Sequence, residues 1–279
     1  MKIDSHQHFW IYNQEDYNWI DEGMNVLRRN FTPEQLWKEQ DKIGFQGSVS
    51  VQARQTLEET LWLLELASKE DRILGVVGWV DLCSQKIEEQ LKEFSSNPGL
   101  IGVRHVVHDE PDDNFMLRAD FQCGISLLKK YGLTYDILIF PKHLPATVEF
   151  VEKFPDQHFV VDHIAKPLIK DQVFLPWEED IRMLAQFPNV YCKVSGMVTE
   201  ADWKKWKPEE IHPYLDIVFN AFGEDRLMIG SDWPVCTLAG KYETVMGVVV
   251  NYFKQYPESV QGKIFGGNCM HFYGISVKE

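Results

Sequence analysis

Short apolar segments alternate along this chain with segments in which apolar residues recur every three or four positions. Nearly continuous apolar runs are typical of strands buried on both faces, and the three-to-four spacing is typical of helices with one buried face. The pattern predicts strands over residues 3–10, 45–52, 73–82, 100–107, 134–140, 158–164, 190–195 and 227–232. It predicts helices that begin at residues 32 and 56 and others over residues 87–94, 121–128, 144–154, 177–187, 209–222, 242–256 and 263–273.

Local start and stop signals support two of the helices. Thr32 is followed by Pro33 and then Gln35, which is the sequence of a capping box with proline at the first helical position. Gly44 predicts the end of that helix. Thr56 and the Glu three residues later predict the same kind of start for the next helix.

Strands that alternate with helices, most of them apolar throughout, are typical of a parallel sheet covered by helices. One (β/α)8 barrel over residues 1–279, counted as a single domain, is the simplest fold for this order and length. The alternative is a doubly wound open sheet, but no GxGxxG or GxxxxGK motif follows any predicted strand.

The composition argues against several classes of binding partner. The 28 Lys and Arg residues are outnumbered by 42 Asp and Glu residues, and the net charge of −14 repels nucleic acid and anionic lipid. No apolar run is long enough to span a bilayer. The five cysteines are odd in number and widely spaced, which favours free thiols in a reducing compartment. We therefore expect a cytoplasmic protein, and a homo-oligomer is left open.

Polar side chains gather where the predicted strands end. In a (β/α)8 barrel the catalytic groups stand at the carboxyl ends of the strands. His6 and His8 are two residues apart on the first strand and share a face with Asp4, so we expect both imidazoles to point into one volume. The other strand ends offer Gln52 and Arg54, Arg104 and His105, Asp162 and His163, Lys193 and Ser195, and Ser231 and Asp232.

The acidic residue in the GSDWP segment, Asp232, is the most informative of these. A buried carboxylate at a strand end is costly unless it binds a cation, accepts hydrogen bonds or acts as a base. Its alternative role, a helix N-cap, is less favoured because Trp233 and Pro234 read as a turn. His163 is a site candidate or a satisfied core histidine. Asp162 would face away from it on a regular strand.

The remaining histidines are predicted to lie outside the site. Three of them fall near helices or at the opposite strand ends, one falls in the last helix, and one falls in an acidic loop as a surface residue. In that order they are His143, His158 and His212, then His271, then His108.

Six motifs in a fixed order carry a family resemblance: HQHFW, GVRH with a later DEP, VVDHIAKP, VYCKVSGMVTEAD, RLMIGSDWPVC and GGNCMHFYG. They resemble the amidohydrolase-2 family, and more narrowly its sugar-lactone hydrolases, which act on L-fuconolactone or L-rhamnonolactone and are related to 2-pyrone-4,6-dicarboxylate lactonase. The resemblance implies a (β/α)8 hydrolase that opens a sugar lactone to the aldonic acid.

The resemblance also implies roles for residues. His6, His8 and Asp232 would hold a metal ion, most simply zinc, or contact the substrate carbonyl. Dinuclear members of the superfamily carry a modified lysine or glutamate on strand four and a histidine on strand five, where this chain has Arg104 and Asp136. This departure argues against a two-metal site and leaves open whether one ion or none is used.

Our sequence-based hypothesis gives Asp232 the role of general base and acid, with His163 beside it and Arg104 stabilising negative charge. The alternative for Arg104 is a salt bridge to the acidic loop over residues 109–113. Trp10, Trp19 and Trp233 would stack on the sugar or simply pack, and Gln52 and Lys166 would bind hydroxyls. Two other functions are retained: non-oxidative decarboxylation of an aromatic or unsaturated acid, and a catalytically inactive barrel that binds sugar acids.

Overall fold

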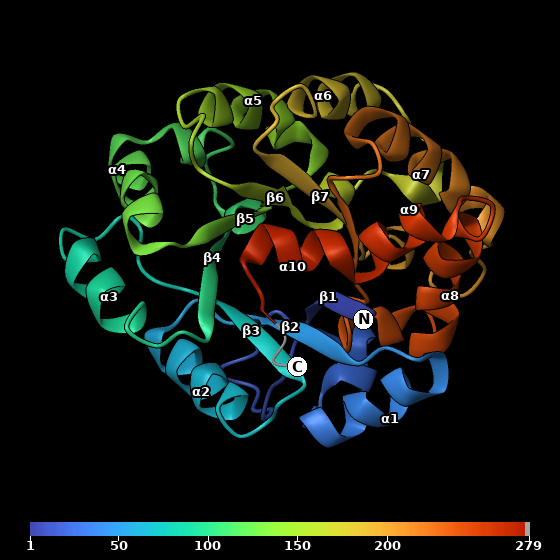
Figure 1. Cartoon of the computed structure of the whole chain (residues 1–279), viewed down its shortest axis with the longest axis horizontal. Coiled ribbons are helices and arrows are strands. Elements are labelled where there is room, and N and C mark those ends of the chain that lie inside the picture. The colour runs from blue at the N-terminus through green and yellow to red at the C-terminus, as the bar shows by residue number, and fades with distance from the viewer. Residues whose placement is uncertain (277–279) are drawn as a thin grey trace.

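Eight parallel strands form the centre of the computed structural model, which describes residues 1–276 (Figure 1). Each strand pairs with the next in chain order. The ring closes where Asp232 donates its backbone N–H to the His6 carbonyl at 2.8 Å and His8 donates to the Trp233 carbonyl at 2.6 Å. The predicted (β/α)8 barrel is therefore confirmed. The strands are β1 (Ile3–Gln7), β2 (Gly47–Val51), β3 (Ile73–Gly78), β4 (Leu100–Val106), β5 (Thr134–Leu138), β6 (Phe159–Val161), β7 (Val190–Val194) and β8 (Leu227–Ile229).

Helices surround the barrel, and the two with local start signals begin after Thr32 and Thr56 as predicted. Gln35 Oε1 accepts the Thr32 backbone N–H at 3.1 Å, and Gly44 ends the helix over Pro33–Ile43 in the left-handed region with φ of 75°. None of the helices within residues 1–276 is long and apolar enough to cross a membrane. The helices are α1 (Pro33–Ile43), α2 (Leu57–Ala67), α3 (Ile87–Phe94), α4 (Ala119–Leu128), α5 (Leu144–Glu152), α6 (Trp177–Leu184), α7 (Pro208–Phe222), α8 (Tyr242–Phe253), α9 (Glu258–Gly262) and α10 (Asn268–Tyr273).

The last helix, α10, lies across one end of the barrel (Figure 1). Cys269, Phe272 and Tyr273 of α10 pack against apolar side chains of the barrel interior, including Ile3 at the start of β1 and Val49 in β2. This packing closes the amino-terminal end of the barrel with an apolar layer. The carboxyl ends of the strands are left to form the site.

Candidate active site

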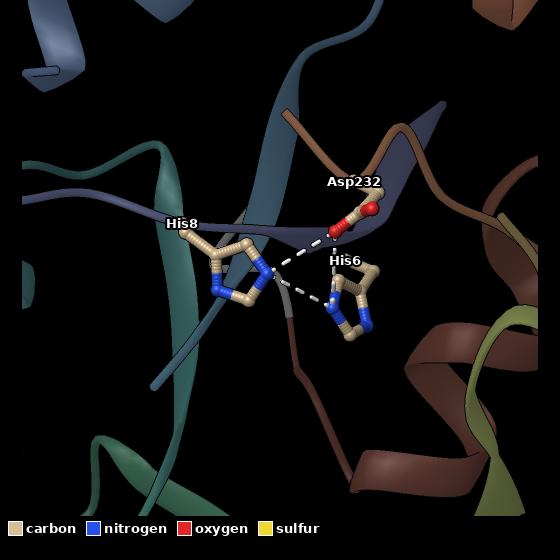
Figure 2. A group of neighbouring side chains, drawn as sticks. All are labelled: His6, His8 and Asp232. Atoms are coloured by element: carbon tan, nitrogen blue, oxygen red, sulfur yellow. Dashed lines mark hydrogen bonds and ion pairs between the residues drawn. The ribbon is translucent and has the colours of Figure 1, made fainter. Parts of the chain in front are cut away.

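Three side chains meet at the carboxyl end of the barrel where β1 adjoins β8 (Figure 2). His6 Nε2 and His8 Nε2 are 3.2 Å apart, and His8 Nε2 lies 3.2 Å from Asp232 Oδ1. The third side of the triangle, from His6 Nε2 to Asp232 Oδ1, is 3.8 Å. All three side chains are buried. The sequence prediction that brought these residues together agrees with this geometry.

The trio has the chemistry of a cation site. His8 Nδ1 lies 2.8 Å from the Val51 carbonyl and must donate to it, so the lone pair on Nε2 of neutral His8 faces the Asp232 carboxylate. Two acceptor atoms that face each other at this distance need a proton or a cation between them. A tetrahedral zinc ion holds its ligand atoms roughly 3.3–3.4 Å apart, and the separations of 3.2, 3.2 and 3.8 Å are close to this spacing.

A second group, His6, Asp162 and His163, also has its ligand atoms close together. Its carboxylate already pairs with Arg104 at 3.0 Å and with Lys193 at 3.1 Å. The group with Asp232 therefore fits a cation better.

The strand that carries the two histidines is not regular. The pairing register between β1 and β2 shifts between Asp4 and Gln7. Asp4 consequently turns away from the imidazoles, and its carboxylate accepts from the hydroxyl groups of Ser231 at 2.6 Å and Tyr242 at 3.1 Å. The prediction that Asp4 shares a face with both histidines was wrong because a bulge changes the alternation.

The segment after β6 also departs from the predicted strand. β6 ends at Val161, and the four residues from His163 to Lys166 all have left-handed backbone angles, with φ between 48° and 60°. Asp162 keeps the inward orientation of Val160 two residues earlier, and the left-handed turn that follows brings His163 to the same side, so the two are not on opposite sides as predicted. The Asp162 carboxylate lies 3.2 Å from His6 Nδ1 in the barrel interior.

The left-handed turn is costly for residues with a Cβ, and such strain is found mostly at functional sites. Here it is held by the indole of Trp177, which donates to the Ile164 carbonyl at 2.8 Å. It brings His163 Nε2 to 3.8 Å from Asp232 Oδ1, while His163 Nδ1 hydrogen bonds to Ser195 Oγ at 2.8 Å. Asp232 itself has a left-handed φ of 57°.

Four charged groups form a balanced cluster below the trio. Arg104 Nη1 donates to Asp162 Oδ2 at 3.0 Å. Lys193 Nζ donates to Asp136 Oδ2 at 2.5 Å and lies 3.1 Å from Asp162 Oδ1. Arg104 thus pairs with Asp162 and not with the acidic loop that was its alternative partner. Because two cations balance two carboxylates, Asp232 supplies the unbalanced charge at the site.

The protonation states follow from burial and from these neighbours. Burial lowers the pKa of His6 and of His163 well below the ordinary histidine value and outweighs the attraction of nearby carboxylates. Burial alone would raise the pKa of Asp232, but electrostatic attraction to nearby groups, His163 first and the Lys166 ammonium among them, holds that pKa below its usual range. At neutral pH His6 and His163 are therefore neutral beside an ionised carboxylate, which is the state that binds a cation or accepts a proton.

A cavity of about 340 Å³ opens above the trio. Arg104, His163 and Asp232 line it, and so does Lys166, whose ammonium pairs with Glu200 at 2.7 Å. Its other lining residues are His8, Trp19, Met24, Ala53, Val106, His108, Asp109, Leu138, Thr199, Glu200, Trp203, Val235 and Leu238.

Three predicted substrate contacts do not line this cavity. Trp10 is fully buried, packs edge-to-face on Phe31 and donates its indole N–H to the Arg29 carbonyl at 2.9 Å. Trp233 is also buried in the aromatic cluster around Phe31. Gln52 is buried behind the site, where its amide nitrogen lies 3.4 Å from the Arg104 carbonyl oxygen. Both tryptophans therefore pack in the protein interior, which is the alternative to stacking on the sugar that the sequence left open.

Sequence reasoning missed some of the residues in and below the cavity. His108 was predicted to be a surface residue, but it lines the cavity and stacks on Phe140 with ring centroids 4.6 Å apart. Its position just after β4 was the available signal. Glu200 gave no such signal, because its role depends on the path of the loop after β7. Lys193 was named among the strand-end residues, but its partners were not predicted.

Comparisons with known proteins identify the family of this chain. The chain matches the family model described as amidohydrolase over residues 3–275. It is 38% identical to an L-fucono-1,5-lactonase of Burkholderia multivorans (strain ATCC 17616 / 249), over 99% of this chain and 96% of that protein. An L-fucono-1,5-lactonase of Burkholderia ambifaria is 35% identical over 98% of this chain and 96% of its own length.

A crystal structure of an amidohydrolase from Burkholderia multivorans with bound zinc superposes with a TM-score of 0.96 at 38% identity, covering 99% of this chain and 100% of that one. The resemblance carried by the six sequence motifs is thereby confirmed, and the chain belongs to the amidohydrolase family.

Proposed function

We propose that this protein hydrolyses the ring ester of a sugar lactone, with L-fucono-1,5-lactone or another deoxy-sugar lactone as substrate. The observation that carries the proposal is the ionised Asp232 beside two imidazoles at the floor of a cavity of about 340 Å³. Two full-length relatives named as L-fucono-1,5-lactonases support this substrate class.

His6, His8 and Asp232 would hold one divalent ion, and we propose zinc because a 38% identical structure contains it. Such an ion supplies Lewis acidity, which polarises a carbonyl and lowers the pKa of water.

Asp232 is the proposed base. Water attacks the lactone carbonyl carbon while a carboxylate oxygen of Asp232 accepts the proton of that water. The bond between the carbonyl carbon and the ring oxygen then breaks, and Asp232 returns the proton to the ring oxygen, which becomes a hydroxyl group. The carbonyl carbon, which has gained the oxygen of the water, becomes the carboxyl carbon of the aldonic acid.

Two further groups assist in this proposal. Arg104 lines the cavity and would stabilise the negative charge that develops on the carbonyl oxygen. His163 is fixed by Ser195 at 2.8 Å, and its second nitrogen faces Asp232 and would orient the carboxylate.

The walls of the cavity suggest how a sugar is held. Lys166 and Glu200 form an ion pair at its edge that offers both donors and acceptors to hydroxyl groups. Trp19 is 36% exposed and lines the cavity, so its indole can cover an apolar ring face.

The experiment compares two assays on the purified protein. Acid release from L-fucono-1,5-lactone and L-rhamnono-lactone is followed with a pH indicator, and CO₂ release is measured with aromatic acids. Lactone opening without CO₂ release supports the proposal, and CO₂ release alone would favour the decarboxylase alternative. Chelation followed by metal analysis then tests the ion, because full activity in metal-free protein would contradict an essential zinc.

We propose the cytoplasm as the location, since the free cysteines fit a reducing compartment.

A further inference from the structure

The nitrogen of His6 that points away from the cavity lies between a donor and an acceptor. His6 Nδ1 is 3.2 Å from Lys193 Nζ and 3.2 Å from Asp162 Oδ1. The contact with Lys193 has hydrogen-bond geometry, and Asp162 Oδ1, which is buried, also lies 3.1 Å from Lys193 Nζ in an ion pair. A donor and a strong acceptor therefore both lie directly beside one imidazole nitrogen of His6.

Lys193 determines which His6 nitrogen carries the proton in this arrangement. An ammonium group has only donors, so whenever His6 Nδ1 accepts from Lys193, neutral His6 carries its proton on Nε2. That proton has an acceptor 3.2 Å away, the Nε2 atom of His8. His8 Nε2 is free to accept because its Nδ1 donates to a backbone carbonyl at 2.8 Å.

This tautomer opposes cation binding. A cation held by His6, His8 and Asp232 needs the lone pair on His6 Nε2, so the proton must move to Nδ1. There the proton has an acceptor, Asp162 Oδ1, at 3.2 Å. Arg104 also favours the Nδ1-protonated tautomer, because its Nη1 donor lies 3.3 Å from His6 Nε2, which must then accept.

We propose that Lys193 and Asp162 compete for His6 Nδ1, and that Lys193 thereby weakens the binding of a divalent cation to His6, His8 and Asp232. The inference rests on the cation site of the proposed function. Lys193 and Asp162 act through His6 and are positioning residues.

The ammonium cannot leave this position easily. Lys193 is fully buried, and Asp136 Oδ2 accepts a hydrogen bond from its Nζ at 2.5 Å. Asp136 is held in turn by the hydroxyl of Tyr273 at 2.8 Å, which reaches into the barrel from α10. Asp136 and Asp162 outweigh the effect of burial and raise the pKa of Lys193, so the donor stays charged. Contacts near the closed end of the barrel therefore hold the Lys193 ammonium beside His6 Nδ1.

The first test needs no variant. Nitrogen-15 NMR of histidine-labelled, metal-free protein distinguishes the two neutral tautomers. We expect His6 to show a major population protonated on Nε2. A wild-type His6 that is protonated only on Nδ1 would overturn the proposal.

The second test removes Lys193 without changing the net charge. The double variant D136N/K193M deletes one carboxylate and one ammonium that pair with each other. We expect its His6 to move to the Nδ1-protonated form. Its affinity for Zn²⁺, measured by competition with a chromophoric chelator, should rise about three- to ten-fold, because the binding-competent tautomer is then no longer a minor one.

Two single variants complete the design. Tyr273→Phe removes a hydroxyl from Asp136 and leaves both partners of His6 Nδ1 in place, so its tautomer and Zn²⁺ affinity should match wild type. Asp162→Asn replaces the carboxylate with a neutral and weaker acceptor, so more of His6 should be protonated on Nε2 and Zn²⁺ binding should be weaker. An unchanged tautomer in D136N/K193M, or equal shifts in Tyr273→Phe, would contradict the proposal. None of these measurements uses a lactone, so failure of the proposed substrate would be seen separately.

Discussion

Gly196 allows His163 to occupy its place in the site, and replacing this glycine should move the imidazole. A Cβ atom at position 196 would lie 2.5 Å from His163 Nδ1 and 2.6 Å from His163 Cγ. Gly196 also has a φ of 60°, in the left-handed region that side chains rarely adopt. The substitution Gly196→Ala therefore combines a backbone cost with a direct clash.

The structure gives a size for both effects. The left-handed backbone costs an alanine roughly 1–2 kcal/mol. To reach ordinary contact, the ring of His163 must move by roughly 1 Å, which breaks its 2.8 Å hydrogen bond to Ser195. A displacement of about 1 Å in a catalytic group costs on the order of 10²-fold in rate.

Gly132→Ala is the matched control. Gly132 has a similar φ of 69°, but nothing lies within 4 Å of a Cβ atom built there. Thermal unfolding should show that both variants lose stability, by the backbone cost alone in Gly132→Ala. Lactone turnover should fall about 10²-fold only in Gly196→Ala. Turnover at the wild-type level in a folded Gly196→Ala protein would refute the role given to the position of His163.

Three other predictions each concern a single side chain. Burial raises the pKa of Glu59 to about 7. The unfolded chain loses this proton near its ordinary pKa of 4.5 while the folded protein keeps it, so the contribution of Glu59 to the free energy of unfolding falls as pH rises from about 4.5 to 7. In urea titrations at pH 5 and pH 8, Glu59→Gln should therefore lose less stability than wild type over this interval; an equal loss contradicts the assignment. Trp10→Ala should destabilise the protein by about 3–5 kcal/mol because the side chain is fully buried, and its KM should stay unchanged. Trp19→Ala should do the reverse, raising KM with little change in Tm, since Trp19 lines the cavity and is 36% exposed; a large loss of Tm would show that Trp19 is a packing residue.

The barrel could be predicted from the sequence because each strand and helix has its own local signal. The apolar run of β7 and the capping residue Thr32 before α1 act within a few positions, so periodicity and capping rules reach them. The strand-end rule of the barrel then brought His6, His8 and Asp232 to one rim without any knowledge of loop paths.

What the sequence did not show depends on departures from regular backbone. The bulge in β1 separates Asp4 from the histidines, and the left-handed turn after β6 brings Asp162 and His163 into one site. Neither can be read from alternation, because tertiary contacts such as the bond from Trp177 to Ile164 hold the strained backbone. The pairing of Lys193 was hidden for a related reason, since its partners come from three other parts of the chain.

Turnover of L-fucono-1,5-lactone by Asp232→Asn, compared with wild type at neutral pH, tests the central claim most directly. Asparagine keeps the size of the side chain and removes the charge that accepts the proton. We expect the rate to fall by at least roughly 10³-fold while circular dichroism and Tm show an intact barrel. A folded Asp232→Asn protein with turnover near wild type would contradict the assignment of Asp232 as the base.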